Sequence, residues 1–420
     1  MSDVRGTNPL YLPPVATRAP LTPAVTSSAS STEAAPLVPC TLGEFTLYFL
    51  RLGTLGFGGP IALAGYMQRD LVEERRWLSK QDYVEGLALA QLAPGPLAAQ
   101  LAIYLGWVRG GVLGASLVGF AFVLPSFLMV LGLAALYVRF GGMSWIRGAF
   151  YGIGAAVIAI IARSVHKLVK LTLAKDKLLW TLFAASAVVT AWTESEVVWL
   201  FLASGLLALF VKAPPRFGAA SSALGAFPLP LWAISGLAGA ASLGTLTTIG
   251  WYFAEAGAFV FGSGLAIVPF LHGGVVTRFH WLNDQQFLDA VAVAMITPGP
   301  VVITVGFIGY LVAGPAGAVV AALATFVPCY LFTVIPAPYF RRFSKNPSLK
   351  AFVDGVTAAA TGAIAGAAFV LGRRALFDVA TVLVALATLG ILLRFKKVQE
   401  PLLILVAGGV GLVLKGIATP

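Results

Sequence analysis

Two Pro-Gly-Pro triplets interrupt apolar segments that are long enough to cross a lipid bilayer. The first is Pro94, Gly95 and Pro96, within residues 81–107, and the second is Pro298, Gly299 and Pro300, within residues 285–310. Proline lacks a backbone N–H, clashes with the preceding helical turn and disfavours helical geometry at the residue before it. A regular helix therefore cannot run through either triplet. The freed backbone groups are tolerated at membrane depth only where they face protein or a water-filled cavity.

The composition identifies the chain as a membrane protein. It has 420 residues, of which 59% are hydrophobic and only 11% are charged, and its mean hydropathy is +0.90. The surface of a soluble protein of this size needs more charge. The short alternating segments of a β-barrel are absent. We therefore predict an all-α polytopic membrane protein whose net charge of +11 reflects basic loops between spans rather than nucleic-acid binding.

The triplets belong to an internal repeat of about 170 residues. Matching positions are Trp77 and Trp281, Glu85 and Asp289, Pro125 and Pro328, and Glu196 and Glu400. We predict a disordered tail over residues 1–40, a first repeat over 41–212, a linker over 213–249 and a second repeat over 250–420. The tail lacks the apolar stretch of a signal peptide, so no cleavage is expected.

Each repeat has about six apolar segments of spanning length, and the linker adds one near residues 227–248. The pattern predicts about 13 transmembrane helices, several of them broken. A linker that crosses once would invert the second repeat relative to the first, as in many secondary transporters. The basic loops favour a cytoplasmic N-terminus and an external C-terminus. Residues 69–80 are an exception, because they are basic but lie on the external side of the membrane in this topology.

A second break occurs earlier in each repeat, at residues 57–60 and 261–264. Half-helices that begin after breaks present unpaired N–H groups and a positive dipole end, which attract anions. Matched breaks in two repeats indicate a transporter's substrate site; alternatively, the glycines only allow close packing and the prolines only kink helices. The candidate substrate-binding residues are Arg51, Phe57, Gly58, Gly59, Gln91, Pro94, Gly95, Pro96, Gln100, Gly262, Ser263, Thr297, Pro298, Gly299, Pro300 and Thr304.

Four charged residues lie inside or near these segments. Arg51 stands one turn before the first break, and a buried arginine costs about 2.5–3.5 kcal/mol. We expect it to meet an anion; alternatively, it pairs with Glu44, Glu85 or Glu255 or extends its charged end to the membrane interface. Glu255 occupies the matching position of the second repeat. Glu85 and Asp289 each precede a triplet by roughly two and a half turns. Glu85, Glu255 and Asp289 are candidate proton carriers, although Glu85 and Asp289 could instead be solvated.

The sequence carries no signature of catalysis. No nucleophile–base pair, phosphate loop or zinc motif appears, so we expect no enzyme activity, no ATP coupling, no metal and no cofactor. His166, His272 and His280 lack companions at metal-ligand spacing. Cys40 and Cys329 are interpreted as small apolar fillers.

Several motifs resemble those of a known family. They are Phe57-Gly-Gly-Pro60, Glu74-Arg-Arg-Trp-Leu78, Gln91-Leu-Ala-Pro-Gly-Pro96 and Phe122-Val-Leu-Pro125. In this duplicated context the chain, from about Thr41 onward, resembles the two-domain chromate ion transporters. The resemblance implies an inner-membrane exporter of chromate that confers resistance and is driven by the membrane potential or an ion gradient. The second repeat departs from the motifs at Ser263-Gly264 and at Met295, which stands where the first has Gln91.

The energetics favour export weakly. Moving a dianion out of a cell that is negative inside gains about 2.3 kcal/mol per charge per 100 mV, enough for a gradient on the order of 10³-fold. The alternatives are a transporter of sulfate or another oxyanion, including one that works as an importer, and a passive anion channel. A membrane enzyme acting on lipid-linked substrates is disfavoured. The expected partners are chromate or sulfate and the lipid bilayer, without nucleic acid; formation of a homodimer stays open.

Overall fold

A computed structural model describes residues 37–57, 59–140, 143–173, 175–194, 198–213, 243–259, 267–340, 346–395, 398 and 400–418. Every regular element in these ranges is a helix, which agrees with the predicted all-α class. Most of the predicted tail, residues 1–36, lies outside them. The predicted linker helix near residues 227–248 is described only from Leu243, where a helix of the second half begins.

The helices of the first half recur in the same order in the second half. The first half contains α1 (Leu42–Leu55), α2 (Gly59–Met67), the π-helix η1 (Gln68–Glu74), α3 (Lys80–Leu92), α4 (Leu97–Phe140), α5 (Ser144–Thr172), α6 (Lys177–Thr193) and α7 (Val198–Lys212). The second contains α8 (Leu243–Phe259), α9 (Ile267–His272), the π-helix η4 (Gly273–Arg278), α10 (Asp284–Ile296), the 3₁₀-helix η5 (Val301–Ile303), α11 (Thr304–Val334), the 3₁₀-helix η6 (Ala337–Tyr339), α13 (Pro347–Ala375), α14 (Val379–Arg394) and α15 (Glu400–Ala418). Even the two π-helices fall at matching positions.

The breaks in the first half are places where the chain turns back on itself. The Tyr48 hydroxyl in α1 donates to the Asp70 carboxylate in η1 at 3.1 Å, so α1 lies beside the segment that follows the break. A Cβ placed on Gly86 of α3 would lie 2.4 Å from the Tyr104 ring of α4, so α3 and the start of α4 also lie side by side. We call residues 42–74 hairpin A and residues 80–109 hairpin B; the first triplet is the tip of hairpin B.

The second half turns back in the same way. The Tyr252 hydroxyl of α8 donates to the Phe270 carbonyl of α9 at 2.6 Å, and α10 packs against η5 and α11. We call the described helices α8, α9 and η4 hairpin C, and we call residues 284–312, with the second triplet at their tip, hairpin D. These segments therefore fold back on themselves instead of continuing as straight broken helices. The predicted count of about 13 crossings, which included all four segments, stays a prediction.

A second reversal follows hairpins B and D. Within α4, Gly110 has φ −148° and Gly111 has φ +59°, and Ala313 and Gly314 of α11 have φ −144° and +62°. The helix that leaves each reversal is long; residues 111–140 span about 45 Å at 1.5 Å per residue. Four helical stretches in the described ranges, in α4, α5, α11 and α13, are long and apolar enough to cross a membrane.

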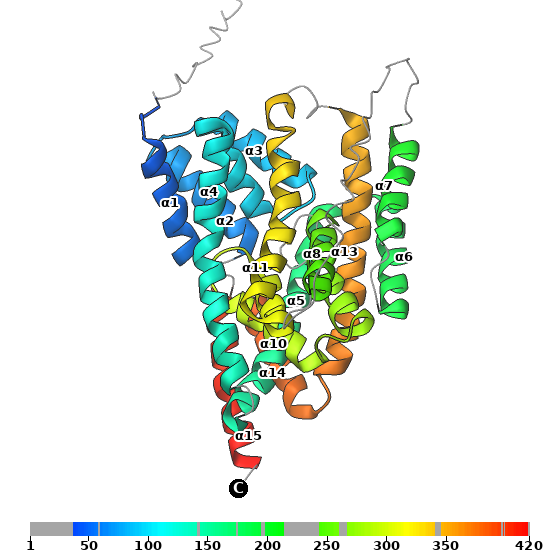
Figure 1. The fold of residues 1–420 in the computed structure, drawn as a ribbon. Coiled ribbons are helices and arrows are strands. Elements are labelled where there is room, and N and C mark those ends of the chain that lie inside the picture. The colour runs from blue at the N-terminus through cyan, green and yellow to red at the C-terminus, as the bar shows by residue number, and fades with distance from the viewer. Residues whose placement is uncertain are drawn as a thin grey trace, which may run out of the picture. The chain divides into compact units, whose positions relative to one another are not determined.

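The two halves interlock through their later helices. The helices α6 and α7 of the first half pack on α13 of the second, and α14 and α15 of the second half pack on α5 of the first. Figure 1 shows α6 and α7 beside α13, and α1, α2 and α3 gathered beside α4. The halves also meet at the hairpin tips, where the Gly299 N–H donates to the Gly56 carbonyl.

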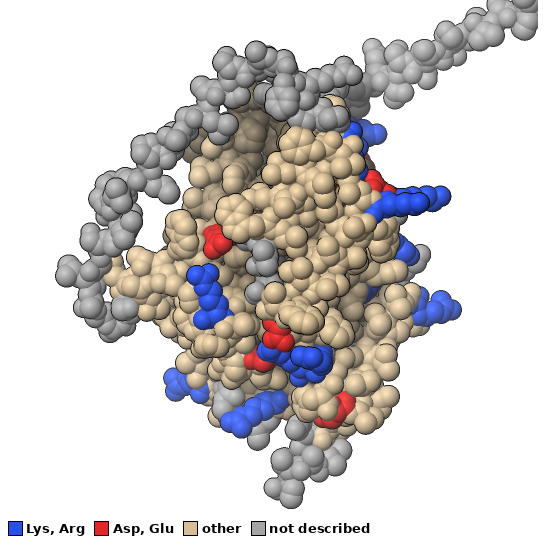
Figure 2. Space-filling model, turned by 90° about the vertical axis from the view of Figure 1, so that its right-hand side faces the viewer, with Lys and Arg blue, Asp and Glu red and all other residues tan. Residues whose placement is uncertain are grey.

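The outward surface is apolar, as a lipid-facing surface requires. Exposed aliphatic side chains on α14 and α15 include Val379, Leu383, Leu386, Leu402, Leu405 and Val413. On the face shown in Figure 2, uncharged residues make up most of the described surface. An apolar surface this extensive would be a liability in water but is suited to a bilayer.

Candidate functional site

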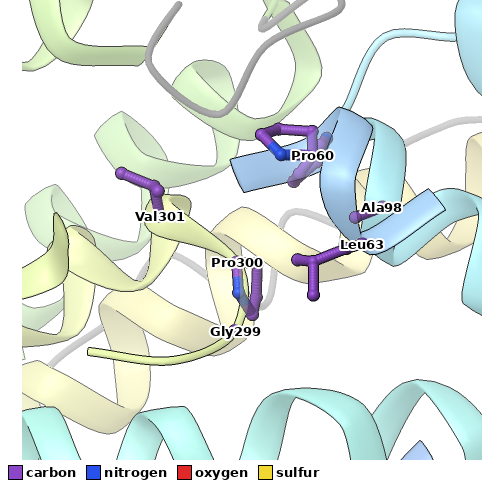
Figure 3. Close-up of a pocket in the computed structure, with 7 residues that line it drawn as sticks. Pro60, Leu63, Ala98, Gly299, Pro300 and Val301 are labelled. Atoms are coloured by element: carbon purple, nitrogen blue, oxygen red, sulfur yellow. The ribbon is translucent and has the colours of Figure 1, made fainter. Parts of the chain in front are cut away.

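Three hairpin tips meet around a small hollow inside the protein. The residues that line it are Pro60 and Leu63 of hairpin A, Pro96 and Ala98 of hairpin B, and Gly299, Pro300 and Val301 of hairpin D. Figure 3 shows Gly299 and Pro300 facing Leu63 and Ala98 across the hollow. Its volume is about 10 Å³, roughly the space of one water molecule. In this conformation the hollow is too small for a tetrahedral oxyanion.

Helix N-termini converge on this hollow. The helices α2 and α4 begin at Gly59 and Leu97, and the helical segment of hairpin D begins at Val301. The first N–H groups of a helix have no partner within it, and the N-terminus carries a partial positive charge. None of the described lining residues is ionised. The hollow therefore offers backbone dipoles from both halves, the chemistry that binds an anion without a buried cation.

The tip of hairpin D is bonded directly to the first half. The Gly299 N–H donates to the Gly56 carbonyl at 2.9 Å, so one triplet contacts the break of hairpin A. The Ser126 hydroxyl, on the long part of α4, lies 2.7 Å from the Pro298 carbonyl and 3.3 Å from the Gly53 carbonyl. We call this contact the Ser126 bridge. Gly299 has φ +99°, a backbone conformation that favours glycine.

The tip of hairpin B is held mainly from within. Gly95 has φ +139°, and the buried Gln100 side chain donates from Nε2 to the Pro94 carbonyl at 2.7 Å. Only the amide nitrogen can donate to a carbonyl, so this bond fixes the orientation of the amide. The other amide atom, Oε1, is buried without a hydrogen-bond partner among the described residues. A Cβ on Gly95 would lie 3.0 Å from Cys329 Sγ on α11, so this tip faces a thiol of the second half.

The structure groups many, but not all, of the predicted site residues. Pro96, Gly299 and Pro300 line the hollow, with Pro94, Gly95, Gln100 and Pro298 in the same two tips. Phe57 is half-buried in the break of hairpin A, and Gly59 begins α2. Thr297 and Thr304 are buried, but their hydroxyls donate to the Val293 and Val301 carbonyls. Gly58, Gly262 and Ser263 lie outside the described residues.

Arg51 and Gln91 do not join this group. Both side chains are exposed, and Arg51 lies outside the face of α1 that buries Phe45, Phe49 and Leu52. The expectation that Arg51 is buried is therefore wrong, and its contact with an anion stays a prediction. Glu44, one of its expected partners, instead accepts hydrogen bonds from Thr41.

The candidate proton carriers differ in their surroundings. Asp289 is 3% exposed and accepts hydrogen bonds from the Tyr137 hydroxyl at 2.6 Å and from Gln285 Nε2 at 2.8 Å. The matching Glu85 is only half-buried and accepts from Gln81 Nε2 at 3.0 Å and from the Tyr104 hydroxyl at 3.4 Å.

Glu255 is half-buried in α8. Within the described residues, no group of three or more His, Cys, Asp and Glu side chains could hold a metal ion.

Sequence reasoning missed Ser126, Gly53 and Gly56. A signal for Ser126 existed, because the alignment of Pro125 with Pro328 places Ser126 opposite Cys329. A small hydroxyl residue inside an apolar span often bonds a neighbouring helix. Nothing in the sequence indicates which carbonyls it contacts, since these belong to two distant segments of the chain.

Comparison with known proteins identifies relatives along nearly the whole chain. The sequence profile described as "Chromate transporter" matches twice, over residues 43–209 and 247–412. The chromate transport protein of Cupriavidus metallidurans is 62% identical over 393 residues, which cover 93% of this chain and 97% of that protein.

Two further relatives are similar over most of their length. A probable chromate transport protein of Synechococcus elongatus is 58% identical over 375 residues, or 89% of this chain and 95% of its own. The chromate transport protein of Pseudomonas aeruginosa is 35% identical over 347 residues, covering 80% and 82% of the two chains. No solved structure shows a significant match.

Proposed function

The chain belongs to the chromate transporter family, and on this premise we propose that it is a secondary transporter that exports chromate across the inner membrane and so confers chromate resistance. Three relatives that cover most of the chain are named for chromate transport. The observation that carries the proposal is the convergence of helix N-termini from both halves on one hollow. Such a site suits a tetrahedral dianion because many N–H groups can share its charge.

The proposed site consists of the tips of hairpins A, B and D. The backbone N–H groups at the start of α2, α4 and η5 would contact the oxyanion, and the glycines of the two triplets would let the backbone approach it closely. The buried Gln100 would position the first tip through its bond to Pro94. Gly58, Gly262 and Ser263 remain candidates from the sequence, whereas the exposed Arg51 and Gln91 are not part of the proposed site.

Transport requires the tips to separate. A hollow of about 10 Å³ admits roughly one water molecule, so the oxyanion can enter only when at least one hairpin moves. A site that is closed in one conformation supports an alternating-access transporter over an open anion channel. We propose that the two halves are inverted repeats, with the N-terminus cytoplasmic and the C-terminus periplasmic.

The membrane potential can supply the driving force. A dianion that leaves a cell with about 100 mV, negative inside, gains about 4.6 kcal/mol. This corresponds to a gradient on the order of 10³-fold. Export of chromate therefore requires no nucleotide.

The test is flux of radiolabelled chromate into everted membrane vesicles that contain the protein. A lumen-positive potential should drive saturable uptake into the vesicles, and vesicles without the protein are the control. A tenfold excess of sulfate should leave most of the chromate uptake intact. A host that produces the protein should grow at higher chromate concentrations than the same host without it. Equal uptake with and without the protein would refute the proposal, and sulfate uptake at the same rate would favour a general oxyanion transporter.

A further inference from the structure

The carboxylate of Asp289 is the most deeply buried acidic group among the described residues. It is 3% exposed, and its two oxygens accept hydrogen bonds from two neutral donors, the Tyr137 hydroxyl at 2.6 Å and Gln285 Nε2 at 2.8 Å. A buried charge normally has an oppositely charged partner. In the described part of the chain no basic side chain pairs with Asp289, so its charged form is only partly compensated.

Apart from Tyr137, the titratable groups on the surrounding helices form no described hydrogen bond or ion pair with Asp289. On the elements packed against α10, the titratable groups whose side chains the structure describes are Tyr104, Arg109, Tyr137 and Arg139 on α4; Arg147, Tyr151, Arg163, His166, Lys167 and Lys170 on α5; His272 on α9; Arg278 on η4; Tyr310, Cys329 and Tyr330 on α11; Lys350, Asp354, Arg373 and Arg374 on α13; and Glu400 on α15. Of these, Tyr137 alone bonds Asp289 in the described structure. Arg163 pairs with Glu400 at 3.6 Å, and Arg374 and His272 both bond Asp284.

The bond to Tyr137 joins the two halves of the molecule. Tyr137 lies on the long helix of the first half, where its ring packs against Phe150 and Phe307. Asp289 lies on hairpin D, about 13.5 Å along the helix axis before Pro298, the start of the second triplet. A proton on Asp289 therefore acts on a contact between the halves and on the electrostatics of the tip at the same time.

The charge of Asp289 and the charge of an oxyanion at the tips oppose each other. A negative carboxylate beside a low-dielectric site weakens the binding of a dianion, and a neutral carboxylic acid does not. Binding of the anion and binding of the proton must then strengthen each other by the same factor. Resting on the proposed function, we propose that Asp289 takes up one proton from solvent when the oxyanion binds at the triplets and releases it when the oxyanion leaves. A proton that travels outward with the oxyanion lowers the net charge moved from two to one, and the membrane potential then contributes about 2.3 kcal/mol per 100 mV.

The matching residue of the first half provides the contrast. Glu85 also accepts from a glutamine one turn earlier, Gln81, but it is half-buried and its tyrosine, Tyr104, belongs to its own hairpin. Glu85 is more exposed than Asp289, and its hydrogen bonds to Gln81 and Tyr104 lie within hairpin B. We assign the linked proton to Asp289 and not to Glu85.

The experiment is calorimetric titration of the purified full-length protein with chromate in buffers of different ionisation enthalpy. For the wild type we expect uptake of about one proton per chromate bound, and an apparent affinity that falls by about tenfold per pH unit while the proton is linked. Asp289→Asn keeps an acceptor for Tyr137 but cannot take up the proton, so it should bind chromate with its linked proton uptake abolished. The matched control, Glu85→Gln, should keep the wild-type value. Titration of chromate itself is common to all variants and cancels in the comparison.

Tyr137→Phe provides a second variant in case Asp289→Asn does not fold. Loss of a donor to the carboxylate favours its protonated form, so the pH range of linked uptake should move upward. Chromate binding with unchanged proton uptake in Asp289→Asn, or in Tyr137→Phe if the first variant does not fold, would overturn the inference and leave the proposed function standing. A wild-type protein that binds no chromate would overturn both.

Discussion

The two Pro-Gly-Pro tips occupy matching places in the repeat but are held by different contacts. The tip of hairpin D is bonded across the halves, through Gly299 to the Gly56 carbonyl and through the Ser126 bridge. The tip of hairpin B is bonded within its own hairpin by Gln100, and it faces the weakly bonding thiol of Cys329. A net hydrogen bond contributes about 0.5–1.5 kcal/mol. We therefore expect the first tip to move more easily and the second to act as the fixed side of the site.

The largest expected effect is that of Gly299→Ala. A Cβ at this position would lie 1.9 Å from Ser126 Oγ, and a side chain at φ +99° is strained by about 1–2 kcal/mol. The methyl group must displace Ser126 and break its bond to Pro298. Chromate flux in vesicles should fall at least about tenfold, which corresponds to about 1.4 kcal/mol. Flux above half of the wild-type value would show that the tip of hairpin D does not need its contact with the first half.

Gly95→Ala should have a smaller effect. Its Cβ would lie 2.6 Å from Gln100 Nε2 and 3.0 Å from Cys329 Sγ, and the end of the long glutamine side chain can shift. The backbone strain remains, so we expect chromate flux to fall by about threefold to tenfold. The ratio of chromate flux in Gly95→Ala to that in Gly299→Ala, measured at equal amounts of inserted protein, tests whether the second tip is the fixed one. A loss in Gly95→Ala that exceeds the loss in Gly299→Ala would reverse the assignment of the fixed and moving tips.

Two separate substitutions, at the matching residues Ser126 and Cys329, test the Ser126 bridge. Ser126→Ala leaves the buried Pro298 carbonyl without its hydroxyl donor, which costs about 1–3 kcal/mol. The midpoint temperature of unfolding in detergent should fall by several degrees. Cys329→Ser places a hydroxyl beside the other tip, and it should slow transport by about twofold to fivefold if it creates a second bridge. Unchanged stability in Ser126→Ala would mean that water replaces the hydroxyl and that the bridge does not fix the tip.

The smallest expected effect is that of Arg51→Ala. The exposed side chain of Arg51 lies outside the hollow, and surface substitutions usually change stability by less than about 0.5 kcal/mol. Chromate flux should stay within about twofold of the wild-type value. Gln91→Ala, at another exposed candidate position, is the matched control. Abolished flux in Arg51→Ala alone would return this arginine to the site in a conformation other than the one described.

The sequence supported some of these features for clear physical reasons. The all-α membrane class follows from the scarcity of charge, and the positions of the breaks follow from the geometry of proline and glycine. The sequence also allowed a prediction of which face of α1 is buried. Phe45, Tyr48, Phe49 and Leu52 form the apolar stripe of a helix, and Arg51 lies outside that stripe. The interpretation of Arg51 as buried overlooked this stripe.

Other features depend on tertiary contacts that no local pattern contains. A break at a triplet does not say whether the chain continues across the membrane or turns back, and here it turns back. The direction is set by contacts such as that of Gly86 with Tyr104. The Ser126 bridge joins Ser126 to Gly53, which is 73 positions away in the chain, and to Pro298, which is 172 positions away. No local sequence pattern could indicate contacts over such separations.

The tight glycine contacts at the second reversal determine how a tip can move. A Cβ on Gly106 would lie 2.5 Å from the Gly114 carbonyl oxygen, and one on Gly309 would lie 2.3 Å from that of Gly317. Each short arm is thus pressed backbone to backbone against the long helix that follows it. The pair should behave as a rigid lever, so that a small tilt of the long helix, applied far out in the bilayer, swings the triplet at the centre.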